Sequence, residues 1–417
     1  MLYERWREIA LKSRNEIALR DFASGKCWTF SQLFAEGEKR AAGGGFIFPQ
    51  GHSPEFIFDL LAAWRENKIV CPLEPGQAPP QIFKPPKHGV HLKCTSATTG
   101  APRLVVFAAE QLQADAENIV ATMGLRADWP NLGVISLAHS YGFSNLVLPL
   151  LLHGVPLILA PAPLPEIIRR ASENKTALTL AAVPVMWRAW HEANAIPQNV
   201  RLAISAGAPL PLNLEKEVFK AGGLKIHNFL GASECGGIAY DASEMPRTVA
   251  TLAGAPMKNV DLSLNNDGCL RVQSRAIGET YWPEKSDSLG CGIFQTSDLA
   301  ELKDGSVFLR GRLSDQINVA GRKVSPETVE RALLENPKVR ECLVFGAPSR
   351  DANRAEIIVV VVVSSASEAE LKKFLSEKLP AWQVPREWKF VESLSTNARG
   401  KISRAEWRRR LAVDSCD

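Results

Sequence analysis

The feature that most constrains this chain is a loop rich in hydroxyl side chains at residues 94–103, CTSATTGAPR. Short alternating or apolar runs at 90–94 and 104–107 flank the loop, and each has the length of a strand. Hydroxyl and backbone N–H groups donate hydrogen bonds to phosphate oxygens, glycine allows close approach, and arginine adds positive charge. The pattern predicts an anion-binding loop between two strands, with a plain surface hairpin as the alternative. The expected ligands are Thr95, Ser96, Thr98, Thr99, Gly100 and Arg103.

The loop does not follow the Walker pattern, G-x-x-x-x-G-K-[ST], which occurs nowhere in the chain. It resembles instead the phosphate loop of the adenylate-forming superfamily, the acyl-CoA synthetases and their relatives, usually written [ST]-S-G-T-T-G-x-P-K. Two positions differ, because Ala97 replaces a glycine and Arg103 replaces the lysine. Arginine keeps the positive charge but presents it in a different geometry.

Composition indicates an ordinary globular protein. The chain has 417 residues, of which 46% are hydrophobic and 23% charged, enough for a large core and two or three domains. The net charge of +4 is small for this length. A run of arginines at 408–410 is expected to be a solvated helix face, so we expect no nucleic-acid partner.

The eight cysteines form no C-x-x-C pair and have no histidine at ligand spacing. Neither a zinc site nor a disulfide framework is indicated, which favours a reducing, cytoplasmic location. The first residues lack the apolar core of a signal peptide. The longest apolar tract, 146–160, is interrupted by prolines and is too short to span a bilayer, so we expect no integral membrane segment.

Helical and strand patterns alternate over residues 17–73, which favours an α/β fold of helix-covered β-sheets. An apolar run at 134–137 predicts a further strand that ends just before His139. Ligands in open α/β sheets bind beyond the carboxyl ends of strands. The resemblance implies that His139 lies beside the acyl carboxylate; a structural histidine is the alternative.

The segment around His139 also bears on the substrate. No acidic residue occurs between Asp128 and Glu166. Relatives that activate amino acids place an acidic residue there, because a buried ammonium group without a partner is costly. Its absence predicts a plain carboxylic acid. Phe143, Leu146 and Ile238 suggest an apolar tunnel, hence a fatty or aryl acid.

Two further motifs match the family in order. Gly207, Ala208 and Pro209 resemble its G-G-A-P adenine platform, although by themselves they indicate only a tight turn. Residues 228–237, NFLGASECGG, resemble Y-G-x-[ST]-E and include Gly231, with Leu230 in place of tyrosine. The resemblance implies that Ser233 hydrogen-bonds the α-phosphate and that Glu234 holds magnesium (Mg2+), which prefers carboxylate and phosphate oxygens.

The later motifs concern the ribose and a mobile lid. Residues 294–299 resemble T-G-D-L, so Asp298 is expected to accept hydrogen bonds from both ribose hydroxyls, and Arg312 to contact ribose and phosphate. Ser314 stands at the hinge position, where relatives carry Asp or Lys. Residues 397–401, NARGK, match N-x-x-G-K and identify Lys401 as the expected catalytic lysine.

We therefore expect a large N-terminal adenylation domain at 1–312 and a small mobile C-terminal α+β lid domain at 313–417. A capping box, Ser367 to Glu370, predicts a lid helix that runs to Leu379. In relatives the lid rotates between two half-reactions and presents the face around Gly321 to a pantetheine thiol.

The resemblance implies that ATP and Mg2+ activate a carboxylic acid as an acyl-adenylate, which a thiol then attacks. His139, Ser233, Glu234 and Lys401 form the expected catalytic set. The acceptor is most simply CoA; phosphopantetheine on an acyl-carrier protein is an alternative. A second alternative is a non-catalytic nucleotide- or acyl-binding homologue, suggested by Ala97, Arg103, Leu230 and Ser314.

Overall fold

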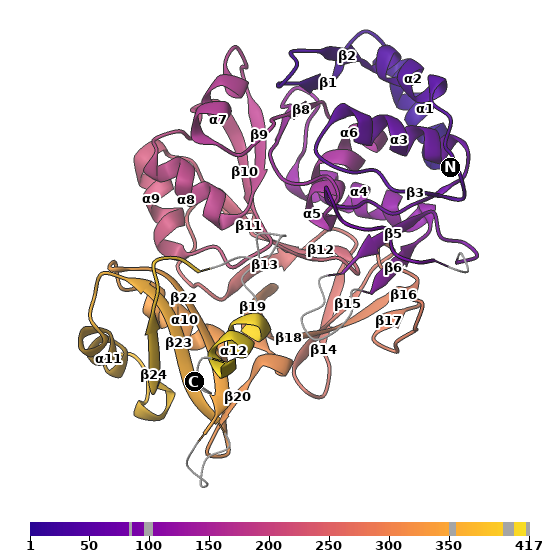
Figure 1. Ribbon diagram of the computed structural model, residues 1–417. Coiled ribbons are helices and arrows are strands. Elements are labelled where there is room, and N and C mark those ends of the chain that lie inside the picture. Colours follow the sequence, from indigo (N-terminus) through magenta and orange to yellow (C-terminus); the bar gives the residue numbers. More distant parts are fainter. Residues whose placement is uncertain (83–85, 96–102, 350–355, 395–403, 414–417) are drawn as a thin grey trace.

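The structure is a computed structural model that describes residues 1–82, 86–95, 103–349, 356–394 and 404–413. Figure 1 shows a large N-terminal part, indigo to salmon, and a smaller orange and yellow C-terminal part beside it. The predicted fold class, an α/β body with a small α+β C-terminal part, is confirmed. The division between residues 312 and 313 stays a prediction.

A 14-stranded sheet runs through the N-terminal part, in the order β14-β15-β18-β19-β13-β12-β11-β10-β9-β7-β8-β1-β2, with β17 paired to β18. Its middle section is parallel from β1 through β8, β7, β9 and β10 to β11. The parallel section comprises β1 (Ile17–Asp21), β8 (Leu157–Leu159), β7 (Asn131–Gly133), β9 (Leu178–Ala182), β10 (Val200–Ser205) and β11 (Ile226–Ala232). The other strands are β2 (Cys27–Thr29), β12 (Gly236–Tyr240), β13 (Leu252–Pro256), β14 (Asp261–Leu264), β15 (Cys269–Gln273), β17 (Leu289–Gly290), β18 (Ile293–Lys303) and β19 (Ser306–Arg312).

A second sheet of five strands carries the predicted phosphate loop, in the order β16-β6-β5-β4-β3. Its strands are β3 (Phe46–Ile47), β4 (Ile69–Val70), β5 (His91–Cys94), β6 (Leu104–Phe107) and β16 (Thr280–Trp282). β5 and β6 are antiparallel, so the expectation that the loop joins two strands is confirmed. β16 adds to β6 although it comes more than 170 residues later in the chain, which places a distant segment beside the loop.

Helices pack around these sheets because their apolar faces need cover. The N-terminal helices are α1 (Leu2–Lys12), α2 (Phe30–Lys39), α3 (Pro54–Arg65), α4 (Ala109–Met123), α5 (Ser140–Gly142), α6 (Leu148–His153), α7 (Pro165–Ser172), α8 (Pro184–Glu192) and α9 (Leu212–Gly222), with a π-helix η1 (Phe143–Val147). Local signals set their ends: Thr29 and Gln32 form a capping box at α2, and Gly124 ends α4 with φ of 67°. Among the described helices, none combines the length and apolar character that crossing a bilayer requires.

One predicted strand is wrong. β7 ends at Gly133, and residues 134–139 form irregular backbone before α5. Side chains bind this backbone in place of a neighbouring strand, because the Ser136 hydroxyl accepts from Ala138 N at 3.2 Å and donates to Glu74. A short buried apolar run has the same sequence pattern whether it is strand or buried loop, so the pattern alone placed the strand end too late.

The C-terminal part has its own hydrophobic core. Its strands are β20 (Ile317–Val319), β21 (Arg322–Val324), β22 (Val339–Pro348), β23 (Glu356–Ser364) and β24 (Glu387–Phe390), and its helices are η2 (Leu313–Asp315), α10 (Pro326–Leu334), α11 (Glu368–Ser376), η3 (Ala381–Gln383) and α12 (Arg404–Val413). The capping box at Ser367 is present, but α11 ends at Ser376, earlier than predicted. Two clusters of buried apolar residues lie within this part, separate from the large N-terminal cluster. Contact between the parts includes a hydrogen bond of 3.3 Å from Arg331 Nη1 to Leu309 O.

Because the cores are separate, a cavity in the C-terminal core should destabilise that part alone. Leu375 is fully buried there, and we expect Leu375→Ala to lower its free energy of unfolding by about 2–5 kcal/mol. Differential scanning calorimetry should show one transition at lower temperature and a second that is unchanged. Leu264→Ala, at a side chain that is 41% exposed, is the control and should change neither transition. A single transition that shifts as a whole would contradict separate cores.

Candidate active site

The ends of the predicted phosphate loop are held together by the β5–β6 hairpin. Thr95 N donates to Arg103 O at 2.8 Å, and Arg103 N donates to Thr95 Oγ1 at 3.3 Å. Thr95 is therefore buried at the base of the loop, where its hydroxyl contacts the backbone of the opposite end. Ser96, Thr98, Thr99, Gly100 and the variant position Ala97 lie outside the described residues, so their roles remain predictions.

A chain of three side chains joins the loop to the predicted magnesium ligand. The Arg103 guanidinium carbon lies 4.0 Å from the centre of the Tyr281 ring, in cation–π geometry. The Tyr281 hydroxyl donates to Glu234 Oε1 at 3.1 Å. Burial, together with the Glu234 carboxylate, raises the pKa of Tyr281 above its ordinary value, so the phenol remains a hydrogen-bond donor. The structure thus brings Arg103 and Glu234, which are 131 positions apart, to one place.

Sequence reasoning missed Tyr281. Its position follows from the pairing of β16 with β6, which sets Tyr281 opposite Val105, two residues beyond Arg103. The only signal in the sequence is a short aromatic run, Thr280–Trp282, and nothing in that run indicates which strand it joins. Pairing between strands far apart in the chain is what the sequence pattern leaves open.

Ser233 and Glu234 lie in the turn between β11 and β12. Glu234 O accepts from Gly278 N at 2.8 Å, which fixes the turn against the segment that leads into β16. The backbones are close here: a Cβ added at Gly231 would lie 2.8 Å from Gly236 O. Close packing of the backbone therefore requires glycine at 231, independently of any part it has in nucleotide binding.

The predicted adenine platform lies at the same edge of the sheet as this turn. Gly207, with φ of 84°, Ala208 and Pro209 are exposed just after β10, and the Ser233 turn follows β11. β10 and β11 are parallel neighbours, with Ser205 paired to Asn228, so the segments beyond both strands emerge together. This is the edge at which open α/β sheets bind ligands.

Asp298 and Arg312 form a pair across two antiparallel strands. They are directly opposite on β18 and β19, and Arg312 Nε donates to Asp298 Oδ1 at 3.0 Å. The Asp298 carboxylate is therefore oriented by the residue predicted to share the ribose with it. Among the described residues, no hydrogen bond or ion pair links either side chain directly to Arg103 or Glu234.

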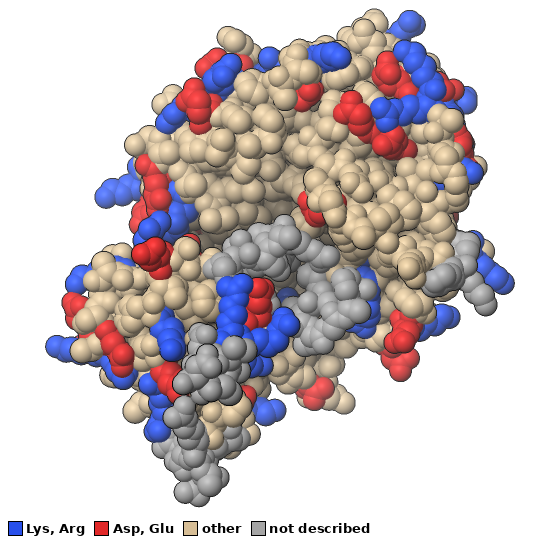
Figure 2. Space-filling model, in the orientation of Figure 1, with Lys and Arg blue, Asp and Glu red and all other residues tan. Residues whose placement is uncertain are grey.

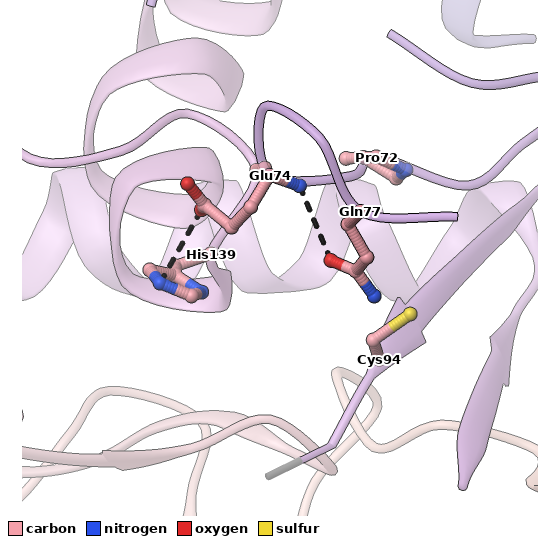
Figure 3. A pocket seen from close by; sticks show the side chains of 6 residues that line it. Pro72, Glu74, Gln77, Cys94 and His139 are labelled. Carbon is pink, nitrogen blue, oxygen red and sulfur yellow. Dashed lines mark hydrogen bonds and ion pairs between the residues drawn. The ribbon is translucent and has the colours of Figure 1, made fainter. Parts of the chain in front are cut away.

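His139 lines an open pocket with Glu74 (Figure 3). His139 Nε2 lies 3.3 Å from Glu74 Oε1, and Glu74 N donates to Gln77 Oε1 at 3.2 Å. Pro72, Cys94 and Ala138 complete the lining, so the pocket lies beside the strand end that enters the phosphate loop. Glu74 is a second residue that sequence reasoning missed. The stretch between Asp128 and Glu166 has no acidic residue, but an earlier segment supplies one next to His139.

The suggested apolar tunnel is wrong in its residues. Phe143, Leu146 and Ile238 are each at most 1% exposed and belong to the large core. Phe143 stacks on His91 with ring centres 4.2 Å apart. These side chains are packed against protein, so they do not line an open tunnel, and they give no measure of an acyl pocket.

The predicted hinge lies at the start of the C-terminal part. Ser314 lies in η2 and donates to Asp315 Oδ1 at 3.2 Å, while Gly321 occupies an exposed turn with φ of 81°. Lys401 lies outside the described residues. Arg404, three positions later, is tied to the region of the hinge by ion pairs with Asp315, Glu327 and Glu330 at 3.0, 2.9 and 2.8 Å.

These residues fit a metal that arrives with a nucleotide. The described residues contain no group of three or more His, Cys, Asp or Glu side chains placed to hold a metal ion. Magnesium commonly takes one or two carboxylates from the protein and its other ligands from phosphate and water. A single carboxylate, Glu234, close to the cationic Arg103 suits that arrangement. Figure 2 shows basic side chains, with acidic ones next to them, where the two parts meet.

Comparison with known proteins gives two family matches. The family of AMP-binding enzymes matches residues 77–282, and the AMP-binding enzyme C-terminal domain matches residues 328–401. An uncharacterized acyl–CoA ligase, YhfT, of Bacillus subtilis is 28% identical over 334 residues, which cover 77% of this chain and 68% of that protein. A feruloyl-CoA synthase of an Amycolatopsis species is 28% identical over 346 residues, 77% of this chain and 69% of that protein.

The fold is shared with o-succinylbenzoate CoA synthetase from Bacillus subtilis, solved in complex with its acyl-adenylate intermediate. The TM-score is 0.82 at 20% sequence identity, and the match covers 97% of each chain. The two family matches together span more than half of this chain, in the order that the motifs predict. The chain is therefore an AMP-binding enzyme of the adenylate-forming superfamily, related there to AMP-forming acid–CoA ligases.

Proposed function

We propose that this enzyme activates a carboxylic acid with ATP and transfers the acyl group to CoA. The observation that carries the proposal is the chain Arg103–Tyr281–Glu234, with a cation–π distance of 4.0 Å and a hydrogen bond of 3.1 Å. In this chain a fixed positive charge and a carboxylate lie on either side of one phenol. Such a pair suits a triphosphate with its magnesium ion. The arginine complements the negative phosphates, and the carboxylate complements the positive metal ion.

In the first half-reaction the protein positions reactants and neutralises charge. The substrate carboxylate attacks the α-phosphate of ATP, the bond to the β-phosphate oxygen breaks, and pyrophosphate leaves with the electron pair. Arg103 and Ser233 would stabilise the charge that develops on phosphate, and Glu234 would hold the magnesium ion that shields it. Asp298, oriented by Arg312 at 3.0 Å, would fix the ribose, and Lys401 would supply a further positive charge.

In the second half-reaction the thiol of CoA attacks the acyl carbon and AMP leaves. We propose that the C-terminal part turns about the hinge at Ser314, so that the Gly321 turn replaces Lys401 at the site. CoA is the preferred acceptor because both relatives are named for CoA ligation. The intact set Glu234, Asp298 and Arg312 argues against a homologue that only binds ligands.

The substrate is proposed to be an aromatic carboxylic acid. The support comes from the relatives, since one is a feruloyl-CoA synthase and the structural neighbour acts on o-succinylbenzoate.

A panel of acids tests this proposal directly. We expect acid-dependent exchange of pyrophosphate into ATP with hydroxycinnamic or substituted benzoic acids, and AMP release only when CoA is added. Fatty acids of 6–16 carbons are the comparison set and should give slower exchange. Nucleotide binding without exchange for any acid of the panel would refute adenylation and leave a binding protein.

Glu234 and Tyr281 can be separated by substitution. Glu234→Gln removes the carboxylate and should lower exchange by about 10²–10³-fold, the usual loss for one group that stabilises transition-state charge. Tyr281→Phe keeps the ring under Arg103 but loses the hydrogen bond, so we expect a loss of about tenfold. Exchange rates at varied Mg2+ measure both. Full activity of Glu234→Gln would contradict the assignment of the metal ligand.

Lys401 should act in one half-reaction only. We expect Lys401→Ala to lower adenylation by roughly 10²–10³-fold, as for the loss of a transition-state donor. Formation of the thioester from synthetic acyl-adenylate and CoA should remain close to the parent rate. Measuring the two half-reactions separately decides the matter, and an equal loss in both would refute the alternating lid.

A further inference from the structure

A buried ion pair lies behind the candidate site. Lys93, on β5, and Asp115, on α4, have side chains that are only 4% and 1% exposed, and Lys93 Nζ lies 3.6 Å from Asp115 Oδ2. Burial lowers the pKa of Lys93, and the facing carboxylate opposes that shift. Burying two charges is costly, and well-packed apolar residues often serve stability as well or better. Packing alone therefore does not explain why this ion pair is present.

The pair holds two further elements by hydrogen bonds. Asp115 Oδ2 accepts from Ser144 Oγ at 2.5 Å, and Lys93 Nζ donates to the same hydroxyl at 3.3 Å. Asp115 Oδ1 accepts from Gly237 N at 3.4 Å. Lys93 Nζ also lies 4.5 Å from the centre of the Phe107 ring. Hence one carboxylate contacts β5, η1 and β12 at once.

The contact with β12 depends on glycine. Gly236 has φ of 69°, and a Cβ added there would lie 2.0 Å from Asp115 Oδ1. No side chain fits in that space, so Gly236 and Asp115 determine each other's position. Cys235, fully buried beside them, directly follows Glu234. The position of Asp115 is thereby transmitted to Glu234 over two residues.

Each of the three contacted elements adjoins a predicted site segment in the sequence. β5 enters the phosphate loop two residues after Lys93, at Thr95. β12 follows the turn of Glu234, and η1 follows α5, which begins after His139. In Figure 1 the labels α4, α5, β5 and β12 lie close together in the lower half of the N-terminal part.

We propose that Lys93 and Asp115 are positioning residues, which hold Thr95, just after β5, and the Glu234 turn at a fixed separation for a magnesium-bound nucleotide. This rests on the proposed function in that it takes the ligand to be a nucleotide triphosphate. The ion pair acts through Gly236, Gly237 and Thr95 and touches no substrate. The charges matter because each one offsets the cost of burying the other. Neither charged side chain would remain buried without its partner.

Binding of a non-reacting nucleotide tests the proposal without any acid substrate. The probe is adenosine 5′-(β,γ-methylene)triphosphate with Mg2+, followed by isothermal titration calorimetry. We expect Lys93→Met and Asp115→Asn each to lower the melting temperature and to weaken binding by about 10- to 100-fold, the range typical of groups that orient a metal ligand. The double variant has no unpaired buried charge, so it should regain melting temperature but not affinity.

Lys225→Met is the matched control. Lys225 is a second buried lysine, 6% exposed in its side chain, in an ion pair of 2.7 Å with Asp241. Its loss should lower the melting temperature while nucleotide affinity stays within about threefold, as expected for a site that shares no partner with the first. Unchanged affinity in all Lys93 and Asp115 variants, or affinity that returns with stability in the double variant, would overturn the proposal.

The outcome is independent of the acid. If the parent protein binds the probe but no acid supports pyrophosphate exchange, the adenylation proposal fails. The nucleotide affinities of the variants still test the positioning role of Lys93 and Asp115. If the parent protein does not bind the probe at all, both proposals fail. Calorimetry of the parent protein therefore comes first.

Discussion

The link between Arg103 and Glu234 depends on β16 pairing with β6 (Figure 1). This one antiparallel pairing carries Tyr281 across more than 170 residues to the foot of the phosphate loop. There the phenol contacts a cation on one side and a carboxylate on the other. Arg103 and Glu234 lie beside different sheets, and without the pairing they would have no side chain between them.

Close backbone approach makes this arrangement rigid. Glycines at 231 and 236 leave no room for a side chain, and the carboxylate of Asp115 occupies the space beside Gly236. Such packing fixes the Glu234 turn before any ligand arrives. Positioning of charged groups in advance is the main way in which a protein stabilises the charge of a transferring phosphoryl group. On our proposal, the buried charges of Lys93 and Asp115 thus serve the geometry of the site.

Some of this could be predicted from the sequence and some could not. The hairpin around the phosphate loop and the capping box at Ser367 depend on local signals, and both are present. Motifs in family order also predicted the family. Tyr281, Glu74 and Asp115 escaped notice because their importance comes from partners distant in the chain. Local periodicity likewise misplaced the strand before His139 and made core residues look like a tunnel, since it cannot distinguish burial in a core from burial around a ligand.

A crystal structure with an ATP analogue and Mg2+ would test the central claim most directly. The account predicts a triphosphate between the Arg103 guanidinium and the Glu234 carboxylate, with the metal ion on Glu234 and the ribose hydroxyls on Asp298. A nucleotide bound elsewhere on the protein, with Glu234 and Asp298 away from it, would contradict the account.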